Sequence, residues 1–351
     1  MQALSLRELE QQARDRLDPA VYDFFAGGAD DEVTLRANEA AFARIGLVPR
    51  VLTGGGRPQL EVELLGSRAS MPVVIAPTAF HRLAHPDGER ATARAAAAAG
   101  TVMIASMAST VAIEEIAAAV PGPWFQLYIQ PDLGFTADVV RRAEAAGCAA
   151  LVVTVDSPVF GRRERDLRHG FAKLPDGMCC ENMRDGDGPP RRFEFTGELS
   201  WEHVEWLRAA TALPIALKGV AHPQDARLAV SAGVDALVVS NHGGRQLDTV
   251  PAAVDLLPAI ADAVGGELPL LVDGGIRRGT DVVKVFALGA TAVAVGRPVL
   301  WGLAVAGERG VSHVLELLRT ELERALMLCG CGSPAQADRD LLRSVEGVEM
   351  R

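Results

Sequence analysis

One short segment of the sequence holds both a potential base and a potential anion-binding group. Residues 240–248 read Ser-Asn-His-Gly-Gly-Arg-Gln-Leu-Asp, so His242 and Arg245 lie three positions apart around two glycines. An imidazole can take a proton near neutral pH, and a planar guanidinium can bind a carboxylate through two hydrogen bonds. The glycines would let the backbone approach a ligand closely. A lone histidine is more often structural, but this combination predicts a general base beside an arginine that binds an anion.

Two further side chains could assist such a base. Asp156 follows an apolar run, and it could hydrogen-bond the imidazole of His242 and stabilise the protonated form. Tyr128 ends another apolar run, and its hydroxyl could donate a hydrogen bond to a substrate oxygen. Tyr128 could equally be a packing residue.

Two glycine turns that carry arginines predict a phosphate site. Residues 273–279 read Asp-Gly-Gly-Ile-Arg-Arg-Gly, and residues 295–297 read Val-Gly-Arg. Each turn would follow a strand and open a helix, where backbone N–H groups and the helix dipole favour a phosphate. One such turn is usually only a tight turn, but two after the last two strands of a barrel indicate a phosphorylated ligand. The candidate phosphate-site residues are Asp273, Gly274, Gly275, Arg277, Gly296 and Arg297.

Lys218 would end an apolar strand with its ammonium group in the mouth of a barrel. Burial of an unpaired charge is unfavourable, so an anion or an electron-rich acceptor should face this group. The N1 and C2 carbonyl of a flavin would be such a partner. A carboxylate of the barrel, such as Asp273, is the alternative.

Eight apolar segments would carry these residues. From residue 72 onward, short runs rich in Val, Ile, Leu and Ala alternate with longer segments of helical character. The runs span residues 72–76, 101–105, 124–128, 149–155, 214–218, 236–240, 269–273 and 291–295. Eight strand–helix units in sequence predict an α/β fold, a (β/α)8 TIM barrel, in preference to an open doubly wound sheet. The site of such a barrel lies at the C-terminal ends of its strands, where the polar residues named above fall.

We expect one domain over residues 1–351, with the barrel at 72–310. Residues 1–45 predict N-terminal helices that cap one barrel end, with Pro19 at a helix start and a Gly-Gly pair at 27–28 as a stop. The connection 161–199 is rich in Gly, Pro, Arg and Asp, predicts no regular element and is a candidate mobile loop. Residues 311–351 predict a C-terminal helix and a tail.

The composition excludes several classes of partner. The chain has 35 Lys and Arg against 45 Asp and Glu, a net charge of -10, so we expect no nucleic-acid partner. No apolar run approaches the roughly 20 residues that cross a bilayer, and the first residues do not read as a signal peptide. The five cysteines lack the spacing of a zinc site, so we predict no metal, reduced thiols and a cytoplasmic location.

Ordered motifs run through nearly the whole chain, at residues 21–25, 76–79, 125–128, 154–158, 161–164, 218–220, 240–248 and 273–279. In this order they resemble the motifs of the FMN-dependent 2-hydroxy-acid oxidases and dehydrogenases. That family includes glycolate oxidase, lactate oxidase, mandelate dehydrogenase and 4-hydroxymandelate oxidase. The number and order of the motifs make the resemblance specific.

The resemblance implies FMN as cofactor and a role for each matching residue. The flavin would be held by Pro77, Thr78, Ala79, Ser106, Gln126, Thr154, Lys218 and Ser240, with the phosphate at the six residues of the glycine turns. The substrate carboxylate would meet Arg245 and Arg163, with Tyr128 nearby. His242, paired with Asp156, would remove a proton as two electrons pass to the flavin. Oxygen would then reoxidise the flavin and yield hydrogen peroxide.

Two departures from the family bear on the substrate. Phe24 stands where many relatives have Tyr, so the pocket wall is more apolar and one hydroxyl for the carboxylate is absent. Met107 stands where glycolate oxidase has a bulky Trp, and its flexible side chain would leave room beside the substrate carbon. With Phe80 and Phe160 also near the site, we expect an (S)-arylglycolate, mandelate or 4-hydroxymandelate, to be oxidised to the arylglyoxylate. A pocket repacked around lactate or glycolate is the alternative.

The resemblance also bears on the electron acceptor. Membrane-bound mandelate dehydrogenases carry an apolar, basic insertion after the fourth strand. The corresponding segment here, residues 170–199, is short and contains several acidic side chains. We therefore expect oxygen as the acceptor and no membrane partner, and the resemblance implies a homotetramer. A non-redox FMN-dependent isomerase is the alternative of another class, but it would not need both His242 and Arg245.

Overall fold

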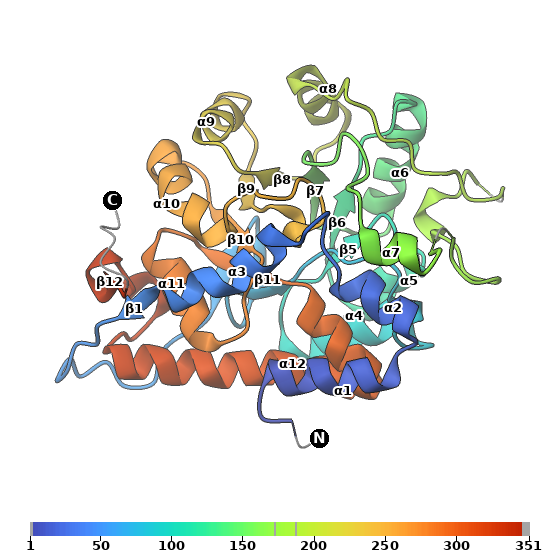
Figure 1. Ribbon diagram of the computed structural model, residues 1–351. Coiled ribbons are helices and arrows are strands. Elements are labelled where there is room, and N and C mark those ends of the chain that lie inside the picture. The colour runs from blue at the N-terminus through green and yellow to red at the C-terminus, as the bar shows by residue number, and fades with distance from the viewer. Residues whose placement is uncertain (1–2, 172, 187, 346–351) are drawn as a thin grey trace.

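A parallel eight-stranded sheet forms the centre of the molecule. The computed structural model describes residues 3–171, 173–186 and 188–345. The strand order is β4-β11-β10-β9-β8-β7-β6-β5 (Figure 1). The strands are β4 (Val73–Ile75), β5 (Ile104–Ser106), β6 (Trp124–Leu127), β7 (Ala150–Thr154), β8 (Ile215–Val220), β9 (Ala236–Val239), β10 (Leu270–Asp273) and β11 (Ala292–Val295). Each coincides with one predicted run, so all eight predicted strands are confirmed.

The sheet closes on itself between its first and last strands. Ile75 in β4 forms a parallel bridge with Met103, which lies just before β5, and its N–H donates to the Val102 carbonyl at 2.9 Å. This closure confirms the predicted (β/α)8 barrel. Apart from Gly219, every residue in these strands is buried, which explains their continuous apolar sequences.

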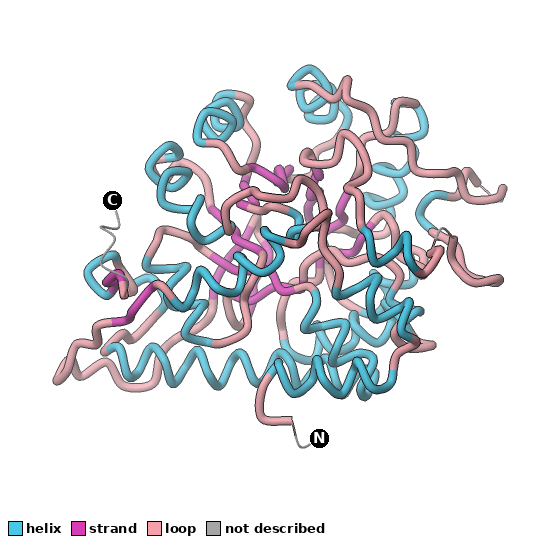
Figure 2. The backbone as a smooth tube through the Cα atoms, viewed as in Figure 1, coloured by secondary structure: helices cyan, strands magenta, loops and turns pink. Residues whose placement is uncertain are grey.

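Helices surround the strands on the outside (Figure 2). They are α4 (Gly88–Ala99), α5 (Ile113–Ala119), α6 (Leu133–Ala145), α8 (Trp201–Ala210), α9 (Pro223–Ser231), α10 (Ala253–Val264), α11 (Gly279–Ala287) and α12 (Arg297–Cys329). The last of these changes direction at Ala306 and Gly307, whose backbone angles are not helical. It therefore joins the eighth barrel helix to the predicted C-terminal helix. Short 3-10 turns are η1 (His81–Leu83), η3 (His242–Gly244), η4 (Pro334–Gln336) and η5 (Arg339–Leu341).

A hairpin covers the N-terminal end of the barrel. It consists of β2 (Val62–Leu64) and β3 (Ser67–Ala69), and Leu64 packs among the inward-facing barrel residues. The indole N–H of Trp124, the first residue of β6, donates to Ser67 Oγ at 3.1 Å. The sequence analysis assigned the capping role to residues 1–45 and did not identify this hairpin.

The N-terminal segment does form helices, as predicted: α1 (Leu6–Arg16), α2 (Pro19–Ala26) and α3 (Val33–Ala43). Pro19 begins α2 after the capping residue Asp18, and α2 ends at Gly27. The first helix lies along α12 (Figure 1). At the start of the third helix, the N–H groups of Val33 and Thr34 donate to the carboxylate of Asp248 at 3.2 and 2.8 Å. This contact attaches α3 to the loop after β9, which carries His242.

Two other segments differ from the expectations. The connection 161–199 contains the helix α7 (Glu164–Arg168), the turn η2 (Glu181–Met183) and a bridge from Arg184 to Pro190, so the prediction that it has no regular element was wrong. Five residues are too few for a helical periodicity to show in a sequence. The small sheet of β1 (Ile45–Leu47) and β12 (Leu342–Ser344) was also not predicted. Residues 172 and 187 of the predicted loop, 346–351 of the predicted tail and 1–2 of the predicted N-terminal segment lie outside the described residues.

None of the described helices is both long enough and apolar enough to cross a membrane.

Candidate active site

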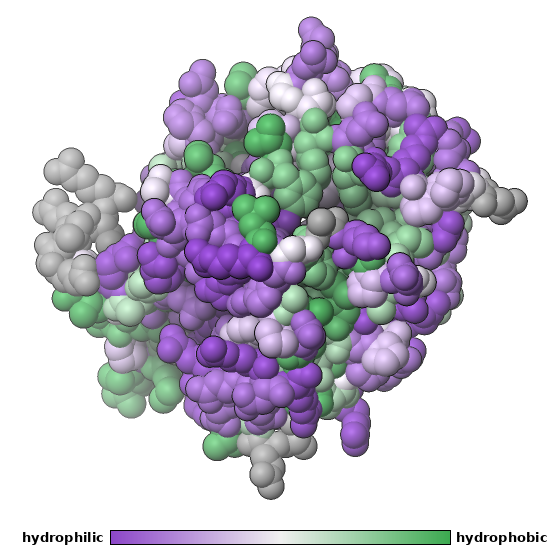
Figure 3. Space-filling model, turned by 45° about the vertical axis from the view of Figure 1, so that its right-hand side comes forward, coloured by the Kyte–Doolittle hydropathy of each residue, from purple (hydrophilic) through white to green (hydrophobic). Residues whose placement is uncertain are grey.

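A cavity opens at the C-terminal ends of the barrel strands. Its volume is about 1360 Å³, including the solvent space in its open mouth. Figure 3 shows hydrophobic surface gathered toward the centre of this side of the molecule, with hydrophilic residues around it. Predicted site residues that line the cavity are Phe24, Pro77, Thr78, Ala79, Ser106, Gln126, Tyr128, Thr154, Arg163, Lys218, His242, Arg245, Asp273, Gly274, Gly275, Arg277, Gly296 and Arg297.

His242 is paired with Asp156, as predicted. The His242 Nδ1 lies 2.8 Å from Asp156 Oδ1, so Nε2 is the ring nitrogen left for a ligand. Burial would raise the pKa of Asp156, but the neighbouring His242 and Lys218 outweigh it and hold that pKa below its usual value. The backbone of His242 is left-handed, with φ of 57°, a conformation that concentrates at functional sites in residues other than glycine. His242 lines the cavity, so its imidazole can meet a ligand there.

Side chains that the sequence analysis did not single out hold the His242 loop. Asn241 and Asn38 exchange two side-chain hydrogen bonds, of 2.9 and 2.8 Å, which tie the loop to α3. Gln246 accepts from the N–H of Gly161 at 3.0 Å and donates to the carbonyls of Asp156 and Val159 at 3.2 and 2.9 Å. Asn241 and Gln246 belong to the motif at 240–248, but nothing local in the sequence marks Asn38 as their partner.

Two partly buried arginines face the apolar ring of Phe24. Arg245 and Arg163 lie over this ring, at 5.1 and 5.6 Å from its centroid. Arg245 donates to the carbonyls of Phe24 and Gly27 at 2.7 and 2.9 Å, and Arg163 Nε lies 2.8 Å from Asp166 Oδ2. Burial lowers the pKa of each arginine, and for Arg245 the nearby Arg163 and Arg297 lower it further. A carboxylate would relieve this concentration of positive charge, so the site favours an anionic substrate.

Tyr128 follows β6 directly and lines the same cavity. Its ring meets Phe193 and Phe195 edge to face, with centroids 5.7 and 5.4 Å apart. Burial, and then the charge of Asp156, raises the pKa of Tyr128 to about 12. The hydroxyl therefore stays protonated and can donate a hydrogen bond at neutral pH. The two phenylalanines were not predicted as site residues.

Lys218 adopts the alternative pairing that the sequence analysis left open. Its Nζ lies 3.0 Å from Asp273 Oδ2 and donates to Ser240 Oγ at 3.0 Å. Burial would lower the pKa of Lys218, but Asp273 outweighs it, so the ammonium stays charged. Asp273 Oδ1 is buried without a partner among the described residues. Both side chains line the cavity, so the pair is also available to a ligand.

A chain of hydrogen bonds crosses the floor of the cavity. Ser106 Oγ donates to Gln126 Oε1 at 3.0 Å, and Gln126 Nε2 donates to Thr154 Oγ1 at 3.1 Å. On the neighbouring β4 side, Thr78 Oγ1 lies 2.7 Å from His81 Nε2. These contacts fix the direction of donors and acceptors along the strand ends.

The two glycine turns form the other end of the cavity. Gly274 and Gly275 have left-handed φ angles of 98° and 80°, and a side chain at Gly275 would collide with the backbone of Asn38. Arg277 pairs with Glu39 at 2.7 Å, while its buried Nε has no partner among the described residues. Gly274, Gly275 and Arg277 line the cavity, so the predicted phosphate site faces it.

Arg297 is more strongly engaged with the protein than predicted. It donates to the carbonyls of Phe25, Gly27 and Gly243 at 3.0, 3.0 and 2.9 Å. Burial, and then Arg277, lowers its pKa to about 10. Arg297 therefore ties the end of α2 to the His242 loop, besides lining the cavity.

Three predicted site residues do not line the cavity. Asp156 lies behind His242, and the Ser240 hydroxyl accepts from Lys218 Nζ and from the His242 N–H at 3.0 Å each. Met107 is fully buried, its sulfur accepts from the Tyr128 N–H at 3.5 Å, and the neighbouring Ala108 faces the cavity instead. The structure thus gives no support to Met107 as a substrate-binding residue.

Comparisons with known proteins decide the family. The protein family described as FMN-dependent dehydrogenase matches this chain over residues 13–344. The chain belongs to this family. It is 47% identical to L-lactate oxidase from Nostoc sp., covering 97% of this chain and 98% of that one, and 47% identical to 4-hydroxymandelate oxidase from Amycolatopsis orientalis, with the same coverage. Glycolate oxidase 1 from Zea mays is 46% identical, covering 95% of this chain and 94% of that one.

A solved structure of mandelate oxidase with (S)-2-phenylpropionate aligns with a TM-score of 0.91 at 48% identity, covering 97% of this chain and 98% of that chain. Relatives that are named for four different substrates thus match almost equally well. Sequence identity alone does not choose among these substrates.

The cavity of this FMN-dependent dehydrogenase fits its cofactor. Gly274, Gly275 and Gly296 line the cavity where the phosphate of the cofactor would lie. Lys218 and the chain from Ser106 to Thr154 offer donors and acceptors to a flavin ring. The buried Asp273 Oδ1 and Arg277 Nε, which lack partners among the described residues, are free to bind polar atoms of the cofactor.

Proposed function

We propose that this member of the FMN-dependent dehydrogenase family is an oxidase that converts an (S)-2-hydroxy acid to the 2-oxo acid and reduces oxygen to hydrogen peroxide. One observation carries the proposal. His242, which is paired with Asp156, and the two arginines over the Phe24 ring line the same cavity. Those groups supply a base and a site for the substrate carboxylate.

The residues divide the chemistry among them. Arg163 and Arg245 bind the carboxylate and orient the alcohol carbon, while Tyr128 donates a hydrogen bond to a substrate oxygen. His242 Nε2 removes a proton from the 2-hydroxy acid, and Asp156 stabilises the imidazolium that results. FMN, when bound, accepts the two electrons of the oxidation.

We further propose that the substrate is an arylglycolate, mandelate or 4-hydroxymandelate. The cavity is lined by Phe24, Phe80, Phe160, Phe193 and Phe195, and this aromatic surface supports an aryl side chain. Glycolate or lactate would leave much of it without a partner. The similarity to solved mandelate oxidase structures is consistent with this choice. The earlier argument from Met107 does not contribute, because that side chain lies outside the cavity lining.

Oxygen uptake with a panel of acids tests the proposal. The purified protein, saturated with FMN, is supplied with (S)-mandelate, (S)-4-hydroxymandelate, (S)-lactate and glycolate. We expect kcat/KM to be higher for the two aryl acids than for lactate or glycolate. A higher value for lactate or glycolate would refute the aryl preference while leaving the oxidase proposal intact. Absence of oxygen uptake and of flavin reduction with all four acids would favour a non-redox isomerase.

The homotetramer and the cytoplasmic location stay predictions. Light scattering of the purified protein tests the first, since a tetramer of the 37.1 kDa chain would have four times that mass. Fractionation of the source cells tests the second.

A further inference from the structure

A group of aromatic side chains on the connection between β7 and α8 takes part in no motif of the family resemblance. Phe160 and Phe195 meet edge to face with centroids 5.1 Å apart, and Phe193 stacks on Phe195 at 6.2 Å. All three line the cavity, and we call them the outer wall. Tyr128 packs edge to face against two of them.

The outer wall begins beside the carboxylate anchors. The Arg163 guanidinium lies over the ring of Phe160, 4.5 Å from the centroid, and Tyr128 touches Phe193 and Phe195. Phe160 is 59% exposed, so the wall continues from the reacting groups to the mouth of the cavity. A substrate held at Arg163 and Tyr128 therefore has this wall within reach of its side chain.

The aromatic group around Phe24 offers less free surface. Phe24 is only 6% exposed, since its ring packs against Phe80 at 5.5 Å and Phe171 at 4.7 Å and is also contacted by Arg163 and Arg245. By contrast, Phe193 and Phe195 are only partly buried. The open aromatic surface thus lies on the outer wall.

Two polar side chains that line the cavity, Gln246 and Ser157, are bonded to other parts of the protein. The Gln246 amide bonds the backbone of Gly161, Asp156 and Val159, and the Ser157 hydroxyl donates to Asp156 Oδ1 at 3.1 Å. The three rings of the outer wall carry no hydrogen-bonding group, so a hydroxyl on the far end of an aryl substrate gains no partner from them. An apolar substituent needs no such partner.

We infer that the outer wall binds the distal end of the substrate side chain and selects 2-hydroxy acids whose aryl group carries an apolar para substituent. This inference rests on the proposed oxidation of arylglycolates and makes its substrate class narrower. It predicts a higher kcat/KM for 4-chloromandelate than for 4-hydroxymandelate, and it assigns this selection to Phe193 and Phe195.

Kinetics of wall variants test the inference. For wild type, Phe193→Ala and Phe195→Ala, kcat/KM is measured with (S)-4-chloromandelate, (S)-4-hydroxymandelate, (S)-mandelate and (S)-lactate. We expect the ratio of 4-chloromandelate to lactate to fall about tenfold in each alanine variant, the size of a lost aromatic contact with its buried area. Phe195→Leu should fall in between, and Leu167→Ala, an exposed position on the nearby α7, should match wild type.

Binding supplies a second readout. Titration with 4-chlorobenzoylformate, followed through the flavin absorbance, should give a dissociation constant that rises about tenfold in the alanine variants. If Phe195→Ala does not fold, Phe193→Ala and Phe195→Leu decide the question.

Three results would overturn the inference. If neither the kcat/KM ratio of 4-chloromandelate to lactate nor the dissociation constant changes in the variants, the outer wall does not determine specificity. If the wild type prefers 4-hydroxymandelate to 4-chloromandelate, the selection of apolar para substituents is refuted. Both leave oxidation of mandelate by the wild type intact. Failure of the wild type to oxidise any aryl acid would reject the proposed function and this inference together.

Discussion

His242 is fixed by its ring, its backbone N–H and its loop. The ring nitrogen Nδ1 meets Asp156, the N–H donates to Ser240 Oγ, and the left-handed backbone is held by the Asn241–Asn38 pair. The side chain can thus be removed without loss of the contacts that shape the loop.

We predict that His242→Ala retains FMN and reduces flavin reduction by substrate at least about a hundredfold, the usual contribution of a general base. Anaerobic rapid mixing with (S)-mandelate measures the rate, and the visible flavin spectrum reports the bound cofactor. Flavin reduction at the wild-type rate would exclude His242 as the base.

Tyr128 permits a direct test of its environment, because the chain has only two tyrosines. Burial and Asp156 raise its pKa from about 10 to about 12, so tyrosinate forms there only at high pH. The favourable contribution of the neutral hydroxyl to folding is complete below about pH 10 and is lost as the pH rises through 12.

We predict a midpoint near pH 12 in the difference between the ultraviolet titrations of wild type and Tyr128→Phe. Tyr22→Phe, which leaves Tyr128 in place, is the control. A difference curve centred at pH 10 would show that the Tyr128 hydroxyl is not shielded as described.

Much of the residue-level site could be predicted from the sequence, because it lies in short motifs directly after apolar strands. His242, Arg245 and the glycine turns are of this kind. Phe193 and Phe195 could not, since no motif or strand end marks them. Met107 failed for a related reason: a sequence position beside the site does not give the direction of the side chain.

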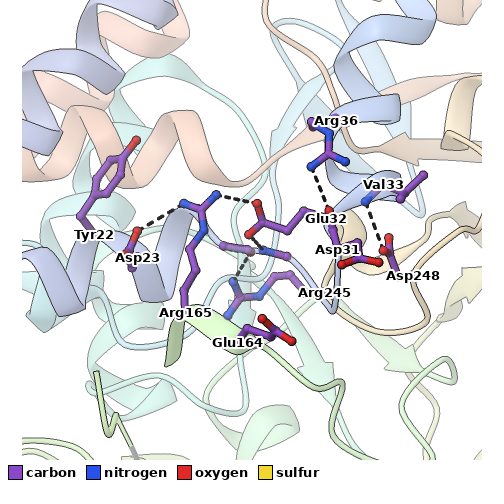
Figure 4. A network of polar contacts seen from close by, with 12 residues as sticks. Tyr22, Asp23, Asp31, Glu32, Val33, Arg36, Glu164, Arg165, Arg245 and Asp248 are labelled. Carbon is purple, nitrogen blue, oxygen red and sulfur yellow. Dashed lines mark hydrogen bonds and ion pairs between the residues drawn. The ribbon is translucent and has the colours of Figure 1, made fainter. Parts of the chain in front are cut away.

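At the level of elements, Arg165 helps to tie α7 to the N-terminal helices. Arg165 donates to Asp23 Oδ1 of α2 at 3.2 Å and to Glu32 Oε2, just before α3, at 2.6 Å. Figure 4 shows Arg165 between these two carboxylates, with Arg245 close by. The contact holds the segment that carries Arg163 against the cavity.

We predict that Arg165→Ala lowers the free energy of unfolding by about 1 kcal/mol, as expected for partly exposed ion pairs, and speeds hydrogen exchange in α7. Arg168→Ala is the matched control, because this residue is on the same helix, 70% exposed, and pairs only with Glu164 among the described residues. Equal exchange in the two variants would contradict an anchoring role for Arg165.

The elements themselves differ in how far they could be predicted. The barrel strands are buried on both faces, so each is a continuous apolar run that the sequence displays. The hairpin β2–β3 and the β1–β12 pair are three-residue strands whose partners are fixed by tertiary contacts. Such short pairings leave no periodic signal in the sequence.

At the scale of the whole molecule, the barrel has a core inside its strands and another outside them. Leu64 of the hairpin is 1% exposed and packs with the interior group. The end of the barrel opposite the active site is thus closed by an apolar side chain from outside the β/α repeat.

We predict that Leu64→Ala lowers the free energy of unfolding by about 2 to 5 kcal/mol, since it leaves a cavity in a packed interior. Leu52→Ala, at a fully exposed leucine in the preceding segment, should have no measurable effect. Denaturant unfolding of the two variants makes the comparison. Equal stabilities would show that the hairpin does not close the barrel.

Anaerobic mixing of the FMN-saturated protein with (S)-mandelate, followed by air, tests the central claim most directly. We predict that (S)-mandelate reduces the flavin, and so bleaches its colour, at least as fast as the enzyme turns over. Air should then restore the colour, with one hydrogen peroxide formed for each flavin reoxidised. A flavin that stays oxidised under (S)-mandelate, and under lactate and glycolate, would contradict the assignment of this cavity to 2-hydroxy-acid oxidation.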